Sequence, residues 1–398
     1  MSRSVDATPR NHPASPTWDT LEAAVLQRYA AGAQRREEGL CCPAASFDPA
    51  LLEILPREIV EKDYGCGDPS THAREGDVVI DLGSGAGKVC YILAQRVGPT
   101  GRVIGIDFND AMLELARKHH ADVTRRIGYD NVSFRKARIQ DLSLDLEQVA
   151  EELEQRPIGT LEDLDRFQAW TERARRDNPL IADDSIDLIV SNCVLNLVRP
   201  DDKPKLFAEM FRVLKPGGRA VISDIVCDVE PPDAVRNDPQ LWSGCIAGAY
   251  REDRFLQAFA RSGFYGIEML ARQTEPWQVV EGIEFRSITI RAFKPEAGPC
   301  LDHGQAVIYR GPWKTVYDDD GHALERGKLT AVRDKTFRRL VDPDGPYAQH
   351  VIGLEPAEPL PPEAVKPFPC GGVSERSPVG LRGARVRDAA SCDGDGCC

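Results

Sequence analysis

The clearest chemical signature of the sequence is an acidic residue followed by a glycine-rich turn. Residues 78–87 read VVIDLGSGAG, so that an apolar run ends in Asp81. Three glycines follow at alternate positions: Gly83, Gly85 and Gly87. The pattern predicts a buried strand and a tight turn whose backbone a ligand approaches closely. The G-x-G-x-x-G spacing that cradles a pyrophosphate is not met, because Lys88 directly follows the third glycine. Asp81 instead favours S-adenosylmethionine, whose cationic methionine moiety carries no phosphate and needs carboxylate partners.

A second acidic residue stands at the end of the next predicted strand. Residues 102–107 read RVIGID and end in Asp107, twenty residues after Gly87. In a doubly wound α/β sheet, an acidic residue at this place accepts hydrogen bonds from ribose hydroxyls. The glycine turn and the two acidic residues together predict a class I S-adenosylmethionine-dependent methyltransferase. The alternative is a structural strand–turn–helix unit in some other α/β protein.

Three cysteines occupy positions near the expected methyl-donor site. Cys193 lies at the end of a predicted strand, Cys245 lies in a glycine-rich segment after the next strand, and Cys66 lies between two glycines. A glycine-flanked thiol should be accessible and mobile, whereas Cys90 and Cys227 should be buried packing residues. Three loop thiols at the rim of a methyl-donor site fit thiolate coordination of a soft centre, thiol methylation or redox chemistry.

The elements that must position these residues alternate between strands and helices from Val78 onward. We expect strands at 78–83, 102–107, 132–137, 185–198 and 219–227, and helices at 88–98, 111–123 and 204–218. Such alternation predicts an α/β fold, a Rossmann-like, doubly wound and mostly parallel sheet with the ligand at the strand C-termini. A smaller C-terminal domain, α+β or β-rich, should follow. Residues 145–178 interrupt the alternation as a charged insertion of one or two amphipathic helices.

The domain organisation predicted from these patterns has five segments. They are an N-terminal arm and helix at 1–39, a cysteine-bearing loop region at 40–75, the methyltransferase domain at 76–292 with a loop segment at 228–262, a C-terminal domain at 293–353, and a flexible cysteine-containing tail at 354–398. The tail is rich in Pro and Gly and is expected to be disordered. His303 and His322 are interpreted as structural residues.

Composition limits the cellular compartment and the kinds of binding partner that we expect. The 398-residue chain has a net charge of −13 and a pI near 5.2, which disfavours nucleic acid as a partner. The sequence shows no secretory signal and no apolar run of the roughly 20 residues that a membrane span needs, so we expect a cytoplasmic protein. In a reducing compartment the twelve cysteines are not a disulfide framework, and no C-x-x-C is present. No sustained heptad pattern argues for more than a monomer.

Five segments resemble the arsenite S-adenosylmethionine methyltransferases. They are YGCG from 64, DLGSGAGKVCY from 81, SNCVLNLV from 191, LKPGGR from 214 and SGCIAGA from 243. The likeness covers roughly 41–353, where GQAVIYRGPW and DDDGHALERGK look like the family's C-terminal domain. The glycine-rich motifs alone are unspecific, but the three cysteine motifs together are highly specific.

The resemblance implies roles for the cysteines. Cys193 and Cys245 would hold As(III), and Cys66 would be a third ligand, either transiently or by forming a disulfide during the cycle. Cys41 or Cys42 would be the N-terminal redox thiol, and the doublet leaves open which of the two it is. The segment at 228–262 would then carry the arsenic-site loop.

The resemblance also implies a set of cofactor-binding residues. These are Tyr64, Asp81, Gly83, Gly85, Gly87, Asp107, Phe108, Met112, Ile139, Gln140 and Asn192. Gly83 would lie near the methionine end, Asp107 at the ribose, and Ile139 with Gln140 at the adenine. Gln140 stands where related sequences often have Glu, and the insertion at 145–178 is longer than is usual for the family.

The expected chemistry is methyl transfer to thiolate-bound As(III), in which the lone pair of arsenic is the nucleophile. The transfer formally oxidises arsenic to As(V), so electrons must return from protein thiols or an external reductant. Pairing of Cys41 or Cys42 with Cys66 would supply them, and glutathione or thioredoxin would restore the thiols. The alternatives are a methyltransferase of an organic small molecule and a non-catalytic metalloid-binding protein. The tail thiols Cys392, Cys397 and Cys398 would either capture a soft ion or play no part in the reaction.

Overall fold

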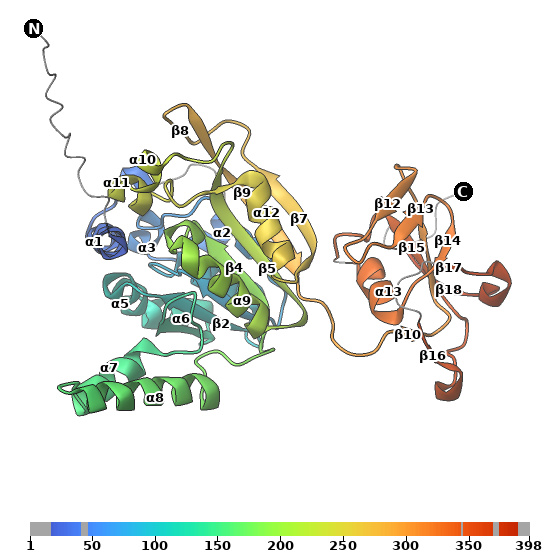
Figure 1. The fold of residues 1–398 in the computed structure, drawn as a ribbon, viewed down its shortest axis with the longest axis horizontal. Helices are drawn as coiled ribbons and strands as arrows, with labels where there is room; N and C mark the ends of the chain where they lie inside the picture. Colours follow the sequence, from blue (N-terminus) through green and yellow to red (C-terminus); the bar gives the residue numbers. More distant parts are fainter. Residues whose placement is uncertain (1–16, 41–46, 344, 369–373, 389–398) are drawn as a thin grey trace, which may run out of the picture. The chain divides into compact units, whose positions relative to one another are not determined.

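The structure, a computed structural model, describes residues 17–40, 47–343, 345–368 and 374–388 (Figure 1). Two compact units are present, one formed by residues 1–263 with 269–292 and one by residues 264–268 with 293–398. None of the helices in the described ranges is long and apolar enough to span a membrane.

A nine-stranded sheet confirms the predicted α/β class. Its strands run in the order β3-β2-β1-β4-β5-β9-β7, with β6 paired to β5 and β8 paired to β9. Their bounds are β1 Val78–Leu82, β2 Arg102–Asp107, β3 Val132–Lys136, β4 Ile186–Asn192, β5 Leu214–Cys227, β6 Tyr250–Arg251, β7 Tyr265–Arg272, β8 Gln278–Val280 and β9 Ile283–Phe293. Strands β1 to β5 pair in parallel. Strands β2 and β3 lie beyond β1, and β5 lies beyond β4, so the strand order reverses between β1 and β4. A ligand crevice lies at the carboxyl ends of the strands at such a reversal.

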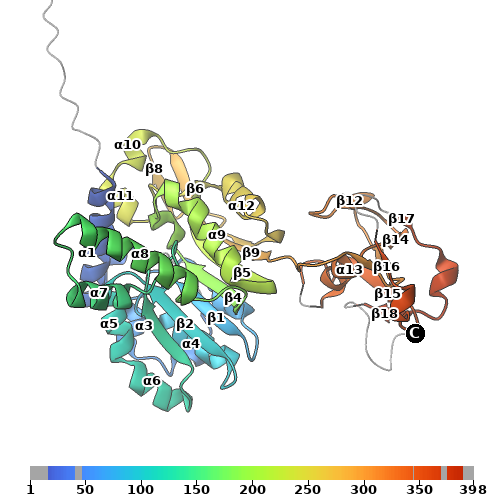
Figure 2. The ribbon, with the colours of Figure 1, turned by 60° about the horizontal axis from the view of Figure 1, so that its bottom comes forward.

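Helices connect and flank these strands (Figure 1). Their bounds are α1 Trp18–Gln34, α2 Pro49–Leu52, α3 Arg57–Glu61, α4 Lys88–Val97, α5 Asp110–Lys118, α6 His120–Ile127, α7 Leu146–Gln155, α8 Leu161–Asp177, α9 Lys203–Val213, α10 Asp233–Arg236, α11 Pro239–Ser243 and α12 Glu252–Arg261. The insertion forms two helices, as predicted: α7 is capped by Asp145, α8 begins with a capping box at Thr160, and the two lie side by side (Figures 1 and 2).

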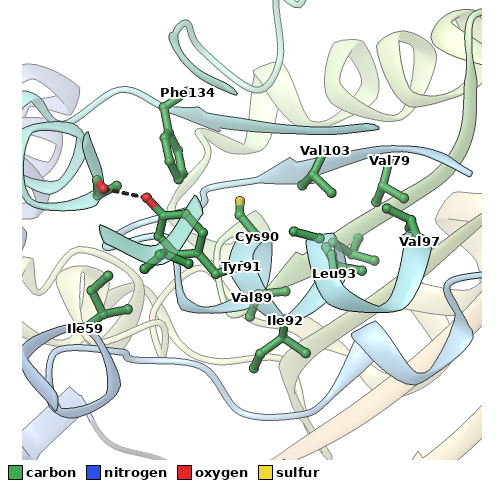
Figure 3. Close-up of a cluster of buried hydrophobic side chains, with 14 of the residues drawn as sticks. Ile59, Val79, Val89, Cys90, Tyr91, Ile92, Leu93, Val97, Val103 and Phe134 are labelled. Carbon is green, nitrogen blue, oxygen red and sulfur yellow. Dashed lines mark hydrogen bonds between the residues drawn. The ribbon is translucent and has the colours of Figure 1, made fainter. Parts of the chain in front are cut away.

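The core beneath the crevice is built on α4, which packs against β1 and β2 (Figure 3). The helix buries most of its residues, and its Tyr91 hydroxyl donates to the Ala116 carbonyl at 2.8 Å. Phe134 from β3 packs edge-on against Tyr91, with ring centroids 5.5 Å apart. A rigid wall of apolar side chains therefore holds the turn after β1 in place.

Strand β4 is shorter than the sequence predicts. We expected the strand to reach Val198, but it ends at Asn192, and Leu195–Leu197 form a short 3-10 helix. The physical reason is Cys193, whose φ of 62° lies in the left-handed region and interrupts an extended strand. Strand β5 begins at Leu214, earlier than the predicted 219.

The C-terminal unit is β-rich. It contains β10 Leu301–Asp302, β11 Ala306–Tyr309, β12 Thr315–Tyr317, β13 Ala323–Glu325, β14 Leu329–Ala331, β15 Val351–Glu355, β16 Lys366–Pro367, β17 Ser374–Glu375, β18 Arg385–Arg387 and helix α13 Asp334–Val341. Its main sheet has the order β17-β14-β11-β15-β18. Residues that we expected to be a flexible tail thus supply β16, β17 and β18. The one proline in these strands, Pro367, lies in a two-stranded sheet, where an edge position tolerates it.

His322 has acidic neighbours in this unit that the sequence analysis overlooked. Its Nδ1 lies 2.9 Å from Asp318 Oδ2, and Asp320 lies nearby. Arg333 and Arg339 form ion pairs with Asp320. Cationic partners already neutralise this acidic group, which agrees with a structural role for His322.

Candidate active site

A cavity occupies the crevice at the carboxyl ends of β1, β2 and β4. Ten of the eleven predicted cofactor residues line it: Tyr64, Asp81, Gly83, Gly85, Asp107, Phe108, Met112, Ile139, Gln140 and Asn192. The eleventh, Gly87, is absent from the lining. A Cβ at Gly87 would lie 2.8 Å from Phe134, so this glycine lets the turn pack against the core and does not face the cavity.

The glycine turn needs its left-handed backbone at two positions that face the cavity. Gly83 has a φ of +75°, and a Cβ there would lie 2.4 Å from Val194 Cγ2. Gly85 has a φ of +51°, and apart from Gly85 and its two chain neighbours no described atom lies within 4 Å of a Cβ built on it. The backbone of Gly85 therefore borders open space in the cavity, as a close ligand approach requires.

Two carboxyl groups stand at the strand ends, Asp81 buried and Asp107 half-buried. The Cys90 thiol donates to Asp81 Oδ2 at 3.2 Å, and burial raises the pKa of Asp81 to about 7. Asp107 accepts hydrogen bonds from the backbone N–H groups of Gly85 and Asn109, both at 2.8 Å. Burial also raises the pKa of Asp107, while these N–H groups oppose the shift. The hydrogen bonds fix the Asp107 carboxylate against the glycine turn.

Helix α1 forms a wall of the cavity that the sequence analysis did not foresee. Trp18, Val25 and Tyr29 line the cavity from this helix. The helix is held there by an ion pair between Glu22 and Arg138 and by the Leu26 carbonyl, which accepts from Asn109 Nδ2 at 2.9 Å. The sequence carries no local signal for this role, because the partners lie many residues downstream.

The three predicted thiols come together at one side of this cavity. Cys66 and Cys193 form a disulfide with their Cα atoms 5.9 Å apart. The Cys245 thiol donates to the Cys193 carbonyl at 3.1 Å, and its Sγ lies 3.7 Å from the Tyr29 hydroxyl. Cys193 also lines the cavity. We expected Cys66 to pair with Cys41 or Cys42; its partner in the structure is Cys193, and the two N-terminal cysteines lie outside the described residues.

The three cysteines are buried, so our expectation that the glycine-flanked thiols are accessible is wrong. The exposed fractions are 1% for Cys66, 6% for Cys193 and 4% for Cys245. Cys193 and Cys245 both have a φ of 62°, a left-handed conformation that non-glycine residues seldom adopt and that concentrates at functional sites. Cys90 and Cys227 are buried as predicted.

The glycines around Cys66 allow close packing of its loop. A Cβ at Gly65 would lie 2.2 Å from Asn192 Nδ2, and a Cβ at Gly67 would lie 2.3 Å from Ser223 Oγ. Asn192 Oδ1 accepts from the N–H groups of Cys66 at 2.7 Å and Gly67 at 3.1 Å, and its Nδ2 donates to the Gly67 carbonyl at 2.8 Å. Asn192 thus clamps the Cys66 loop while it also lines the cavity.

Two further polar side chains hold the Cys245 loop. Asn196 Nδ2 donates to the carbonyls of Ile225 at 2.7 Å and Cys245 at 3.1 Å, and Lys203 Nζ donates to the Gly248 carbonyl at 2.5 Å. Burial, followed by the nearby Asp224, raises the pKa of Cys245 to about 12, so the thiol is protonated at neutral pH.

Sequence reasoning did not single out Asn196, Lys203 or Asp224. Burial lowers the pKa of Lys203 to about 8 and raises that of Asp224 to about 6. For Asn196 and Asp224 a signal existed, because each is a polar residue that interrupts an apolar run, SNCVLNLV or SDIV, and buried polar groups need partners.

The fold and the site together define a class I S-adenosylmethionine-dependent methyltransferase. The defining features are the order of the strands, the glycine turn, the acidic residues at the strand ends and the cavity in the crevice. A model described as a methyltransferase domain matches residues 73–152 and 169–263, and one described as a domain of unknown function (DUF8838) matches residues 296–386.

Comparison with individual proteins identifies the family within this class of methyltransferases. The chain is 33% identical over 320 residues to an arsenite methyltransferase of Aquipseudomonas alcaligenes, covering 76% of this chain and 81% of that protein. It is 28% identical over 298 residues to the arsenite methyltransferase of Homo sapiens, covering 72% of this chain and 69% of that protein. The crystal structure of an arsenic (III) S-adenosylmethionine methyltransferase from Chlamydomonas reinhardtii matches with a TM-score of 0.52 and 28% identity, covering 83% of this chain and 98% of that one. The protein belongs to the arsenite methyltransferase family.

Proposed function

We propose that the protein transfers methyl groups from S-adenosylmethionine to As(III) bound by Cys66, Cys193 and Cys245. The observation that carries this proposal is the convergence of the three sulfur-bearing residues beside a cavity that Cys193 itself lines. Sulfur ligands suit a soft metalloid, and a pyramidal site with three sulfurs leaves arsenic a lone pair for nucleophilic attack.

The cavity residues fit S-adenosylmethionine. Ser84 Oγ lines the cavity and is buried, yet it has no hydrogen-bond partner among the described residues, so a polar ligand atom is its natural partner. Gly85 leaves open space beside the turn, and the Asp81 and Asp107 carboxyls supply acceptors for the methionine and ribose moieties. The bound cofactor supplies an electrophilic methyl group on its sulfonium.

Arsenic binding requires the reduced form of the Cys66–Cys193 pair. Arsenite, As(OH)₃, exchanges its three hydroxyl groups for three thiols and releases three water molecules, with no net change in protons. The protonated Cys245 thiol, whose pKa is about 12, therefore suits this exchange. The buried loops that Asn192 and Asn196 hold keep the sulfurs near one another and near the cavity.

The electrons that methyl transfer withdraws from arsenic can return from two of its own ligands. When two As–S bonds break and the sulfurs join, arsenic gains two electrons and returns to the trivalent state. The disulfide between Cys66 and Cys193 is the bond that this step would form. A cytoplasmic thiol, glutathione or thioredoxin, would then reduce the disulfide for the next turnover.

The decisive experiment measures arsenite-dependent transfer of labelled methyl groups from S-adenosylmethionine in the presence of glutathione. We expect activity for the wild type, loss of activity for Cys193→Ser and Cys245→Ser, and retention for the control Cys227→Ala, which removes a buried cysteine outside the proposed ligand set. Full activity in Cys193→Ser would refute the ligand set. Arsenite binding without transfer would identify a metalloid-binding protein.

A further inference from the structure

The sulfur of Cys245 makes polar contacts with two residues and can donate its hydrogen to only one of them. Cys245 is a free thiol outside the disulfide, and it donates to the Cys193 carbonyl at 3.1 Å. The Tyr29 hydroxyl lies 3.7 Å from Cys245 Sγ. Because a thiol carries a single hydrogen, the sulfur is the acceptor in this second contact and the Tyr29 hydroxyl is the donor.

Arsenic binding would change these two contacts in opposite ways. When Cys245 bonds to As(III), its hydrogen leaves with a hydroxyl group of arsenite as water, so the Cys193 carbonyl loses its donor. The Tyr29 hydroxyl keeps its hydrogen, and the sulfur that accepts it takes on the negative charge of an arsenic-bound thiolate. Hydrogen bonds to charged acceptors are stronger than those to neutral ones, so the contact with Tyr29 should strengthen as the other is lost.

We propose that Tyr29 is a positioning residue for the arsenic site, whose hydroxyl donates a hydrogen bond to the arsenic-bound sulfur of Cys245 and orients that ligand. The inference rests on the proposed function in taking Cys245 as an arsenic ligand. Groups that hydrogen-bond to a metal ligand fix its orientation, and their removal typically costs about 10–100-fold in affinity or activity.

Helix α1, which carries the tyrosine, is tied to the segment that precedes Cys245, and it lies beside α11 in both views (Figures 1 and 2). Arg28 Nη1 donates to the Gln240 carbonyl at 3.0 Å and to Ser243 Oγ at 3.2 Å. The ring of Trp18 packs edge-on against that of Trp242, with centroids 5.1 Å apart. None of these contacts involves the tyrosine hydroxyl, so its removal should leave the helix in place.

The experiment measures arsenite binding to the reduced full chain by the near-ultraviolet absorbance of the arsenic–sulfur bonds. No S-adenosylmethionine is present, so a contact between Tyr29 and the cofactor in the cavity that it lines has no influence on the result. Tyr29→Phe removes the hydroxyl and keeps the ring. Tyr129→Phe is the matched control, since the Tyr129 hydroxyl donates to the Ala94 carbonyl at 3.2 Å and both tyrosines are half-buried. Thermal unfolding checks that each variant is folded.

We expect Tyr29→Phe to raise the dissociation constant of arsenite by about tenfold and Tyr129→Phe to leave it unchanged. At saturating arsenite, the absorption band of Tyr29→Phe should lie at longer wavelength than that of the wild type, because loss of the hydrogen bond raises the energy of the sulfur lone pairs. In a Cys245→Ala background, which leaves Cys66 and Cys193 to bind arsenite, Tyr29→Phe should change neither the dissociation constant nor the band.

Wild-type affinity or an unshifted band in Tyr29→Phe would overturn the proposal. An equal loss of affinity in Tyr129→Phe, or in the Cys245→Ala background, would overturn it as well, since the effect would then not depend on the Cys245 sulfur. If Cys245→Ala alone binds arsenite as tightly as the wild type, the proposed ligand set fails and this inference fails with it. Weaker binding by Cys245→Ala together with wild-type behaviour of Tyr29→Phe would overturn this inference alone and leave the ligand set standing.

Discussion

Asn192→Ala tests whether one side chain holds the Cys66 loop in place. The Asn192 amide makes three hydrogen bonds to backbone groups of Cys66 and Gly67, at 2.7, 3.1 and 2.8 Å. A buried backbone group that loses its partner costs about 1–3 kcal/mol. Because Asn192 lines the cavity, water can enter in its place, so we take the lower value for each group. The substitution should destabilise the closed loop by about 3 kcal/mol.

This energy corresponds to an increase of about 100-fold in the open population of the loop. Hydrogen exchange of a peptide that covers residues 60–70, read by mass spectrometry, measures it directly. In the reduced protein the exchange of this peptide should accelerate by about this factor. In the oxidised protein the acceleration should be smaller, since the disulfide to Cys193 keeps Cys66 in place.

Asn178→Ala provides the control. Asn178 caps the C-terminal end of helix α8, and none of the three hydrogen bonds that hold the Cys66 loop involves it. Unchanged exchange of the 60–70 peptide in reduced Asn192→Ala would refute the assignment of Asn192 as the clamp. Equal acceleration in the Asn178→Ala control would refute it as well, since the effect would then be general destabilisation.

Two further substitutions test the cofactor site. Gly85→Ala and Gly217→Ala place an alanine at φ of +51° and +82°, where no described atom lies within 4 Å of the added Cβ, so each should cost about 1–2 kcal/mol of unfolding free energy by chemical denaturation. Only Gly85→Ala, which borders the cavity, should weaken S-adenosylmethionine binding in calorimetry, and equal binding by both variants would contradict the placement of the cofactor. Burial raises the pKa of Asp81 from 3.8 to about 7, so the folded state retains this proton at a pH where the unfolded state has lost it. As the pH rises from 4 to 7, this carboxyl should lower the unfolding free energy by up to about 1.4 kcal/mol per pH unit. Asp81→Asn should remove that pH dependence. An Asp81→Asn variant whose unfolding free energy keeps the wild-type pH dependence would show that Asp81 is not its cause.

Local patterns predicted the parts of the site that local sequence determines. The run VVIDLGSGAG specifies a buried strand and a left-handed turn by itself, because apolar β-branched residues and glycines have strong backbone preferences. Asp107 followed from the regular spacing of βα units. These positions therefore line the cavity as predicted, apart from Gly87.

Long-range packing determines the parts of the site that the local sequence does not predict. The glycines beside Cys66 indicated a special backbone, but the sequence does not distinguish a loop that is mobile from one that another segment approaches closely. Asn192, 126 residues downstream of Cys66, makes that approach and turns an expected surface thiol into a buried one. Tyr29, 216 residues upstream of Cys245, reaches its thiol from a helix with no chemical motif.

The burial of the thiols changes how the site must work. An exposed thiol would meet arsenic and reductant through the same solvent, but Cys66 and Cys193 border two different cavities. Methyl transfer requires the cofactor cavity, which Cys193 lines and Cys66 does not. Asn192 holds the Cys66 loop and also lines the cofactor cavity, so this one side chain connects the Cys66 loop with the cofactor site.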